Sequence, residues 1–251
     1  MKKVAALALL AMAGSALAGN TVVITYDGGF GASVNNVYNA VAVADPFATH
    51  LYNPAPGAVA AYMGSNTVDN LFIFDITSFN MMDGSDAAAV GAWYNSSKSA
   101  MIDGRSYSMY FNGNSTSSDE GTYIQNTANW FLNNDGGLWI GTDHDPEWTF
   151  NGNQYLVAAG FNPIVGLESG PATGWNASPL FDGVNVPGLD WSGGNWSVGH
   201  TPVGLQPNGV TLSNILYSGP GDPMISTYLV PAPGAAGALA LVGIAALRRR
   251  R

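Results

Sequence analysis

Apolar runs alternate with amphipathic stretches over the first two thirds of the chain. Four runs are rich in β-branched and aromatic residues and lie beside Gly, Asn or Asp, as strands do. These runs are Thr21–Tyr26, Asn70–Ile76, Tyr107–Gly113 and Leu138–Asp143. A weaker fifth candidate is Phe47–Tyr52. The pattern predicts four or five strands separated by long connections.

The connections carry apolar residues at the i, i+3, i+4, i+7 spacing of a helix face. Ser33 is expected to cap the first helix, and Ser117 with Glu120 forms an S-x-x-E capping box before the third. Gly136 and Gly137 are expected to stop that third helix. The three stripes consist of Val34, Val37, Tyr38 and Val41; of Val90, Trp93, Tyr94, Ser97 and Met101; and of Ile124, Ala128 and Phe131.

Near-continuous apolar strands that alternate with helices are typical of a parallel sheet covered on both faces. The pattern therefore predicts an α/β fold, a flavodoxin-like (Rossmann-like) three-layer sandwich with a mainly parallel sheet. From about residue 161 the chain becomes rich in Gly, Pro, Asn and Trp. This predicts a C-terminal extension of loops or β-structure, residues 161–229, within one domain of residues 19–229. The sheet is expected to contain Val22–Tyr26, Leu71–Ile76, Met109–Asn112 and Leu138–Thr142.

The first 18 residues have the pattern of a secretory signal. Two lysines precede an apolar stretch from Val4 to Met12, and Ala16 and Ala18 supply the small residues of an A-x-A cleavage site. Residues 1–18 are therefore expected to be a signal peptide, removed when the chain is exported.

The C-terminal segment, residues 230–251, combines two prolines, an uncharged apolar stretch and four arginines. Counted from Val230, 18 residues precede Arg248, which is close to the lower limit for spanning a bilayer. Arg248, Arg249, Arg250 and Arg251 are expected to stay on the cytoplasmic side. The segment therefore predicts a short transmembrane stop with the domain outside.

Val230, Pro231, Ala232 and Pro233, followed by the apolar stretch and the arginines, resemble the PEP-CTERM sorting signal of Gram-negative bacteria. Ala232 stands where the usual motif has Glu. The resemblance implies an exosortase, a membrane transpeptidase-like enzyme, that cuts near Val230–Pro233. It also implies transient anchoring in the inner membrane, after the Sec translocon and signal peptidase, and delivery to the cell surface or extracellular matrix.

Charge excludes one class of partner. Between Gly19 and Leu229 there are two basic residues, Lys98 and Arg105, against all 17 acidic residues, a net charge of −15. Nucleic acid is therefore not expected as a partner, because phosphate contacts need clustered Lys and Arg. Cations, basic partners and neutral glycans, such as extracellular polysaccharide, remain. The chain has no cysteine, so thiolate zinc sites and cysteine nucleophiles are excluded.

The segment Tyr123–Asp145 combines a helix, a Gly-Gly pair, a strand and a histidine. It is similar to a unit of the ThuA-like and class I glutamine amidotransferase-like superfamily, and the resemblance covers roughly residues 20–185. It implies an amidotransferase-like α/β domain. The family's nucleophilic cysteine has no counterpart here.

Polar residues follow the predicted strands. In an open parallel sheet, ligands gather at the carboxyl ends of the strands. His144 could act as a base oriented by Asp143, Asp143 and Asp145 could hold a divalent cation such as calcium, or these residues could cap helices and bond within loops. The residues expected at this edge are Asp27, Asp75, Asn112, Asp143, His144 and Asp145.

Histidines and tryptophans outside this edge form two further sets of candidates. His50 and His200 are isolated and are interpreted as surface or loop residues. Trp175, Trp191 and Trp196 could form a sugar-stacking platform, although covering the core beneath loops is the favoured interpretation.

The chain is therefore expected to be an exported cell-surface or matrix protein with a non-catalytic domain. The alternative is an extracellular hydrolase or glycan-binding protein that uses the strand-end site around His144.

Overall fold

The structure is a computed structural model that describes ten segments of the chain. They are residues 20–26, 31–75, 84–94, 98–103, 115–134, 136–141, 149–169, 172–188, 197–219 and 221–229. The predicted signal peptide, the predicted sorting signal and the predicted strand Met109–Asn112 lie outside these segments.

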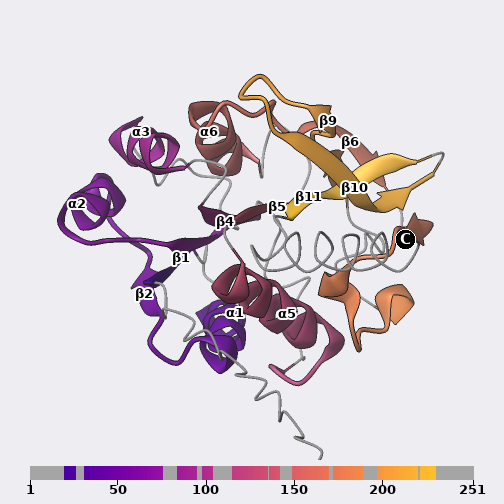
Figure 1. Ribbon diagram of the computed structural model, residues 1–251, viewed down its shortest axis with the longest axis horizontal. Coiled ribbons are helices and arrows are strands. Elements are labelled where there is room, and N and C mark those ends of the chain that lie inside the picture. Colours follow the sequence, from indigo (N-terminus) through magenta and orange to yellow (C-terminus); the bar gives the residue numbers. More distant parts are fainter. Residues whose placement is uncertain are drawn as a thin grey trace, which may run out of the picture.

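A parallel sheet forms the centre of the domain (Figure 1). Its five parallel strands are β2 (Thr49–Tyr52), β1 (Thr21–Tyr26), β3 (Asn70–Asp75), β4 (Ser99–Asp103) and β5 (Gly137–Gly141). Four antiparallel strands extend it beyond β5: β11 (Asp222–Leu229), β10 (Thr211–Ser218), β7 (Gly174–Trp175) and β9 (Gly204–Leu205). The order is β2-β1-β3-β4-β5-β11-β10-β7, with β9 also paired to β10. A separate two-stranded sheet pairs β6 (Val165–Ser169) with β8 (Ser197–His200).

Helices cover both faces of the sheet. On one face α1 (Gly31–Ala44) packs against α5 (Asp119–Asn133). On the other face α3 (Gly84–Trp93) packs against both α2 (Ala58–Ser65) and α6 (Phe150–Ala158). The two helical layers lie on opposite sides of the parallel strands in Figure 1. The protein is therefore an α/β three-layer sandwich with a mainly parallel sheet, as the sequence predicts.

Alternate residues of each strand enter opposite cores because successive strand side chains point to opposite faces. Phe72, Met101 and Trp139 lie in the core beneath α1 and α5. Their neighbours Ile73 and Ile140 lie in the core beneath α2, α3 and α6. All five side chains are fully buried. Burial on both faces explains why the strands are apolar throughout rather than alternating.

The predicted strands at Val22–Tyr26, Leu71–Ile76 and Leu138–Thr142 are confirmed as β1, β3 and β5, and the weaker candidate as β2. The strand between β3 and β5, however, is β4, which pairs with both neighbours. The prediction that Met101 continues a helical stripe is wrong, because α3 ends at Trp93 and Met101 is buried in β4. The helical spacing from Val90 to Met101 is a coincidence between a helix and the short strand that follows it.

Two other local predictions need correction. The side chain that caps α5 is Ser118, whose Oγ accepts the N–H of Gly121 at 3.2 Å, rather than Ser117. Ser33 does not precede the first helix, because α1 begins at Gly31. The predicted C-terminal extension is β-structure that joins the main sheet, since β10 and β11 form a hairpin whose second strand pairs with β5.

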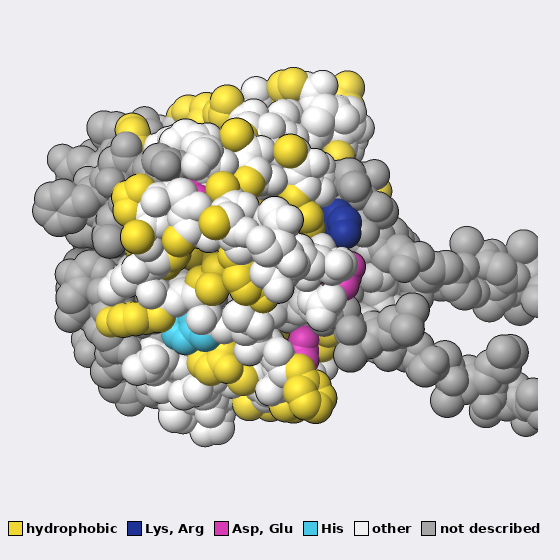
Figure 2. All heavy atoms as spheres, turned by 90° about the vertical axis from the view of Figure 1, so that its left-hand side faces the viewer, with side chains coloured by type: hydrophobic (Ala, Val, Ile, Leu, Met, Phe, Trp, Pro, Cys, Tyr) yellow, Lys and Arg dark blue, Asp and Glu magenta, His cyan; other side chains and the backbone are white. Residues whose placement is uncertain are grey.

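None of the described helices is long and apolar enough to cross a membrane. The face shown in Figure 2 is covered mostly by hydrophobic and uncharged polar side chains, with few charged groups among the described residues.

Glycine at position 91 allows α3 and α6 to approach closely. A β-carbon at Gly91 would collide with the carbonyl group of Ala158 and would lie 2.8 Å from its Cβ. We expect Gly91→Ala to lower the free energy of unfolding by about 2 kcal/mol, because a packed interface cannot absorb the extra atom. Gly64, in α2, has open space around the corresponding position. Gly64→Ala should raise the stability by up to about 1 kcal/mol through helix propensity. Urea denaturation of both variants measures the difference, and equal effects would contradict the close contact.

Candidate functional site

The carboxyl ends of the parallel strands lie along one edge of the sheet. Tyr26 is paired in register with Asp75, Phe74 with Asp103, and Asp103 with Gly141. Two acidic residues therefore end adjacent strands, β3 and β4. The strand order β2-β1-β3-β4-β5 is that of doubly wound folds, in which the order of the strands reverses between β1 and β3 while all of them run in the same direction. Ligands of such folds bind at this edge, which we call the carboxyl edge.

Of the residues that the sequence predicts for this site, the structure describes one. The backbone of Asp75 ends β3 at the carboxyl edge, as expected. The other five, Asp27, Asn112, Asp143, His144 and Asp145, lie outside the described segments.

Asp103 was missed by sequence reasoning, and the structure brings its backbone beside that of Asp75. It was missed because Met101 was assigned to a helix. Taken as a strand, Ser99–Asp103 would have shown the same apolar run ending in Asp as Asn70–Asp75 does.

Lys98 is held at the opposite edge of the sheet, which we call the amino edge. Its Nζ lies 3.7 Å from Oδ1 of Asp69, 3.2 Å from the carbonyl oxygen of Val68 and 5.9 Å from the ring centroid of Trp93. Oδ2 of Asp69 also accepts the backbone N–H of Asn20 at 2.9 Å. Lys98 is therefore committed to contacts where the strands begin.

This position matters for the charge of the carboxyl edge. Lys98 directly precedes β4 and Asp103 ends it, so four residue steps, or about 13 Å, separate Ser99 from Asp103 along the strand. Lys98 cannot form an ion pair at the carboxyl edge from its observed position. The second basic residue of the domain, Arg105, lies outside the described segments.

Within the described segments there is no group of three or more His, Asp or Glu side chains that could hold a metal ion. The predicted cation ligands Asp143 and Asp145 are not among those residues. A cation site at the carboxyl edge therefore remains a hypothesis based on the sequence and the strand topology.

Asp86 is a buried acid with a structural role. Its two carboxylate oxygens accept the backbone N–H groups of Gly57 and Ala60, each at 2.8 Å. These groups begin α2, so the carboxylate of one helix caps the amino end of its neighbour, where negative charge is favourable. Since the carboxylate holds α2 against α3, we assign Asp86 to stability rather than to chemistry.

His50 is also structural, and its interpretation as an isolated surface or loop residue is wrong. It lies on β2, and its Nε2 is 2.7 Å from Oγ1 of the buried Thr25. Its ring stacks on that of Tyr38 with centroids 4.3 Å apart and planes 6° apart. The ring of Tyr52 meets it edge-on at 5.9 Å. Burial lowers the pKa of His50.

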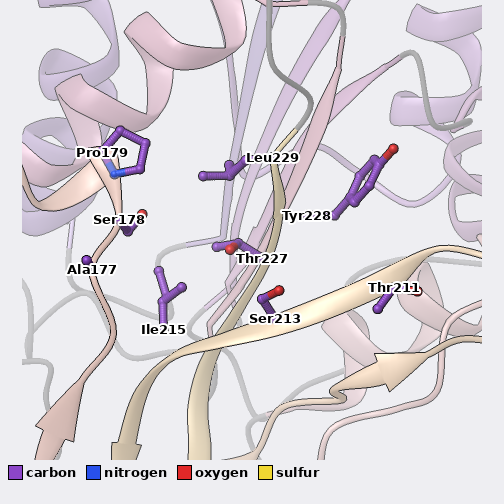
Figure 3. A pocket seen from close by; sticks show the side chains of 9 residues that line it. All are labelled: Ala177, Ser178, Pro179, Thr211, Ser213, Ile215, Thr227, Tyr228 and Leu229. Atoms are coloured by element: carbon purple, nitrogen blue, oxygen red, sulfur yellow. The ribbon is translucent and has the colours of Figure 1, made fainter. Parts of the chain in front are cut away.

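Three hollows whose described lining is known lie at the amino edge of the sheet. The first, about 260 Å³, is shown in Figure 3 and lies beside the ends of β10 and β11. The second, about 530 Å³, lies where α3 and α6 end. The third, about 260 Å³, lies beside the starts of β1 and β2. None of the described residues that line them is Asp, Glu, Lys, Arg or His.

Trp175 lies on β7 and is 46% exposed, so the expectation that it covers the core is wrong. Trp191 and Trp196 lie outside the described segments. A platform formed by the three tryptophans therefore stays a prediction.

Comparison of the chain with protein-family models, with curated proteins and with solved structures found no match. The function is therefore argued from the residues themselves.

The environment of His50 predicts a dependence of stability on pH. Its pKa in the folded protein is below the value of 6.5 expected for the unfolded chain, so the unfolded chain takes up the proton first on acidification. His50 therefore contributes stability above pH 6.5 that is lost as the pH falls through the lower folded-state pKa. We expect the free energy of unfolding to fall less between about pH 7.5 and pH 5 in His50→Gln than in the wild type. Urea titrations at both pH values test this, and an unchanged difference would contradict it.

Proposed function

We propose that this chain is an exported surface or matrix protein that uses both of its ends as processing signals. Residues 1–18 direct export, residues 230–251 are recognised by an exosortase, and the α/β domain between them is the delivered cargo. Export, sorting and the amidotransferase-like relationship all rest on the sequence patterns. The domain has a non-catalytic role in this proposal, since the cysteine that would be the nucleophile in the resembling family is absent from the whole chain.

One structural observation carries the proposal: both ends of the described domain leave from the amino edge of the sheet. Five residues form a continuous row across neighbouring strands. Thr21 pairs with Asn70, Asn70 with Ser99, Ser99 with Gly137, and Gly137 with Leu229. The first begins β1, directly after the described residue 20, and the last ends β11, directly before residue 230.

This row brings the two ends close to each other. Four strand spacings separate Thr21 from Leu229, which amounts to about 19 Å. Residues 1–18 and residues 230–251 are both expected to act at the same membrane during export, and two ends that share one edge can face that membrane together. The shared edge supports such an arrangement, with the amino edge toward the bilayer and the carboxyl edge away from it.

The processing can be measured directly by intact mass. We expect the protein recovered from the cell surface or medium of a producing strain that contains an exosortase to lack residues 1–18 and most of residues 234–251. Replacing Arg248–Arg251 by four serines should release protein that keeps its tail, because nothing then holds the tail on the cytoplasmic side. Replacement by four lysines is the matched control and should preserve retention in the membrane. Wild-type surface protein that retains its arginines would refute the sorting proposal.

A second candidate function is ligand binding or hydrolysis at the carboxyl edge, centred on His144 with a cation held by Asp143 and Asp145. It is favoured by the adjacent strand ends at Asp75 and Asp103 and by the commitment of Lys98 to the other edge. The register pairs Asp103 with Phe74, so Asp75 and Asp103 are offset by one residue and add negative charge to the edge rather than forming a facing pair. Negative charge without a basic partner favours a bound cation.

This second candidate predicts a response to calcium. Millimolar calcium should raise the melting temperature of the protein by a few degrees, since a ligand that binds only the folded state stabilises it. Asp143→Asn and Asp103→Asn should each reduce the increase, whereas Asp182→Asn, which changes an exposed acid on another segment, should not. A melting temperature that calcium leaves unchanged would contradict the hypothesis that the carboxyl edge binds a cation.

A further inference from the structure

The amino edge of the sheet carries the most exposed large hydrophobic side chains among the described residues. Phe47 is 87% exposed, Leu205 74%, Val43 59% and Val157 57%, and no other described side chain of this kind exceeds 52%. Val43 lies in the last turn of α1, and Phe47 follows it shortly before β2 begins. Val157 lies in the last turn of α6, and Leu205, on β9, pairs with Thr211 at the start of β10. All four positions therefore belong to one edge.

These positions lie on both sides of the two ends of the described domain. Phe47 precedes β2, which pairs with β1, the strand that begins at Thr21. Leu205 lies on β9, which pairs with β10, the neighbour of the strand β11 that ends at Leu229. Six strand spacings, about 29 Å, separate β2 from β10. Figure 1 shows β2 and β9 at opposite ends of the sheet, so exposed apolar side chains bracket the edge from which both flanking segments leave.

The exposure of Phe47 is built into the turn that carries it. Oδ1 of the buried Asp45 accepts the backbone N–H of Phe47 at 3.1 Å, and the carbonyl oxygen of Asp45 accepts the N–H of Ala48 at 3.0 Å. These bonds fix the backbone between α1 and β2, with Ala48 buried and Phe47 projecting from the surface.

Leu205 is presented by a similar arrangement. The side-chain amide of the buried Gln206 donates to the carbonyl oxygens of Val203 and Gly204, each at 3.1 Å. The backbone N–H of Gln206 also donates to the carbonyl oxygen of Val210 at 2.8 Å. Because the backbone on both sides of the edge is held in this way, the exposed side chains gain burial only from a surface outside the domain.

The charged groups described at this edge are engaged within the protein. Lys98 pairs with Asp69, and the carboxylate of Asp45 is buried in its turn. By contrast, Asp75 and Asp103 end their strands at the carboxyl edge. An anionic lipid surface repels carboxylates, so the amino edge is the side that a domain with a net charge of −15 can turn toward a membrane.

The segment that follows the domain indicates what covers this edge. Four residues, Val230–Pro233, separate Leu229 from the apolar stretch that begins at Gly234. Four extended residues span at most about 14 Å. A tail embedded in the bilayer therefore holds the amino edge close to the lipid surface, within reach of the side chains that project from it.

We propose that the amino edge is a lipid-contacting surface, in which Phe47 and Leu205 enter the interfacial region of the bilayer on either side of the two chain ends. Apolar side chains are stabilised at the boundary between headgroups and acyl chains. This inference rests on the proposed function, because the tail has to lie in the membrane for the edge to reach the lipid. The contact keeps residues 230–233 at the membrane surface, where a membrane enzyme cuts.

Fluorescence from single labels in the full chain tests the proposal, since a chain without cysteine allows one introduced cysteine to carry the label. Phe47→Cys, Leu205→Cys and Phe150→Cys are labelled with a nitrobenzoxadiazole dye and reconstituted in phosphatidylcholine vesicles. Phe150 is the matched control, because it is also an exposed Phe and begins α6 at the carboxyl edge. We expect doxyl groups on the acyl chains to quench the labels at 47 and 205 about twofold or more, and to leave the label at 150 unquenched.

A second set of variants separates contact from tethering. A label at Val157→Cys reports the distance of the amino edge from the lipid while other positions are changed. Phe47→Ser combined with Leu205→Ser should reduce the quenching of this label by about half or more, whereas Phe150→Ser should not. The serine variants should keep the wild-type melting temperature, since the side chains that they replace are exposed.

Three results would overturn the inference alone, in a chain that sediments with the vesicles. They are labels at 47 and 205 that are quenched no better than the label at 150, quenching at 157 that the serine variants leave unchanged, and a blue shift without quenching that grows with protein density. The last of these would place a second copy of the chain on the edge. A full chain that does not sediment with the vesicles would overturn the inference together with the sorting proposal, so the two failures are distinguishable.

Discussion

The parallel pairing of β1, β3, β4 and β5 constrains where every other part of the domain can lie. Parallel neighbours cannot be joined by a tight turn, so each connection must return to the starting edge, and in this chain helices cover both faces. The carboxyl ends of all the parallel strands then lie at one edge of the sheet, and their starts lie at the other. The antiparallel pairing of β11 with β5 carries the chain back once more, so that Leu229 ends in the same row as Thr21.

The same constraint separates charge along the sheet. A strand that ends in Asp places that acid at the carboxyl edge, and a Lys directly before a strand lies at the amino edge. Asp103 and Lys98 occupy these two positions around β4. In a domain with two basic residues, the contacts of Lys98 with Asp69 and Val68 leave at most one basic side chain for the carboxyl edge. Electrostatic balance at that edge therefore has to come from Arg105, from solvent or from a bound cation.

The strands with the clearest hydrophobic pattern were the ones that the sequence predicted correctly. The strands β1, β3 and β5 were predictable because burial on both faces makes them continuous apolar runs. The strand β4 was missed because five residues, two of them Ser and Asp, fit a helical stripe as well as a strand. The C-terminal extension was predicted as loops or β-structure without locating its strands, because register shifts near Leu216 break the period of two in β10 and Pro223 lies near the start of β11.

The sequence also predicted site positions that depend on local structure and missed those that depend on tertiary contacts. The position of Asp75 could be predicted because it depends only on strand direction. The hollow beside Tyr94 could not, because it is formed by residues just past α3 and α6, by the loop before β10 and by β10 and β11, whose proximity no local pattern records. Tyr94 was expected on a helical stripe but lies just past the end of α3, where it is buried.

The change from parallel to antiparallel strands after β5 explains why two hollows lie beside the hairpin. Each pair of successive parallel strands is joined by a connection that crosses one face of the sheet. The antiparallel strands β10 and β11 are joined by a turn, so no connection between them crosses a face. The helices that belong to the parallel strands end beside β11, with Tyr94 just past α3 and Ala159 just past α6. On the other face the segment from Ala177 to Pro179 lines the hollow beside the pair. Among the described elements, the sheet therefore continues further than its helical layers do, and strand residues of β10 and β11 line the space left on each face.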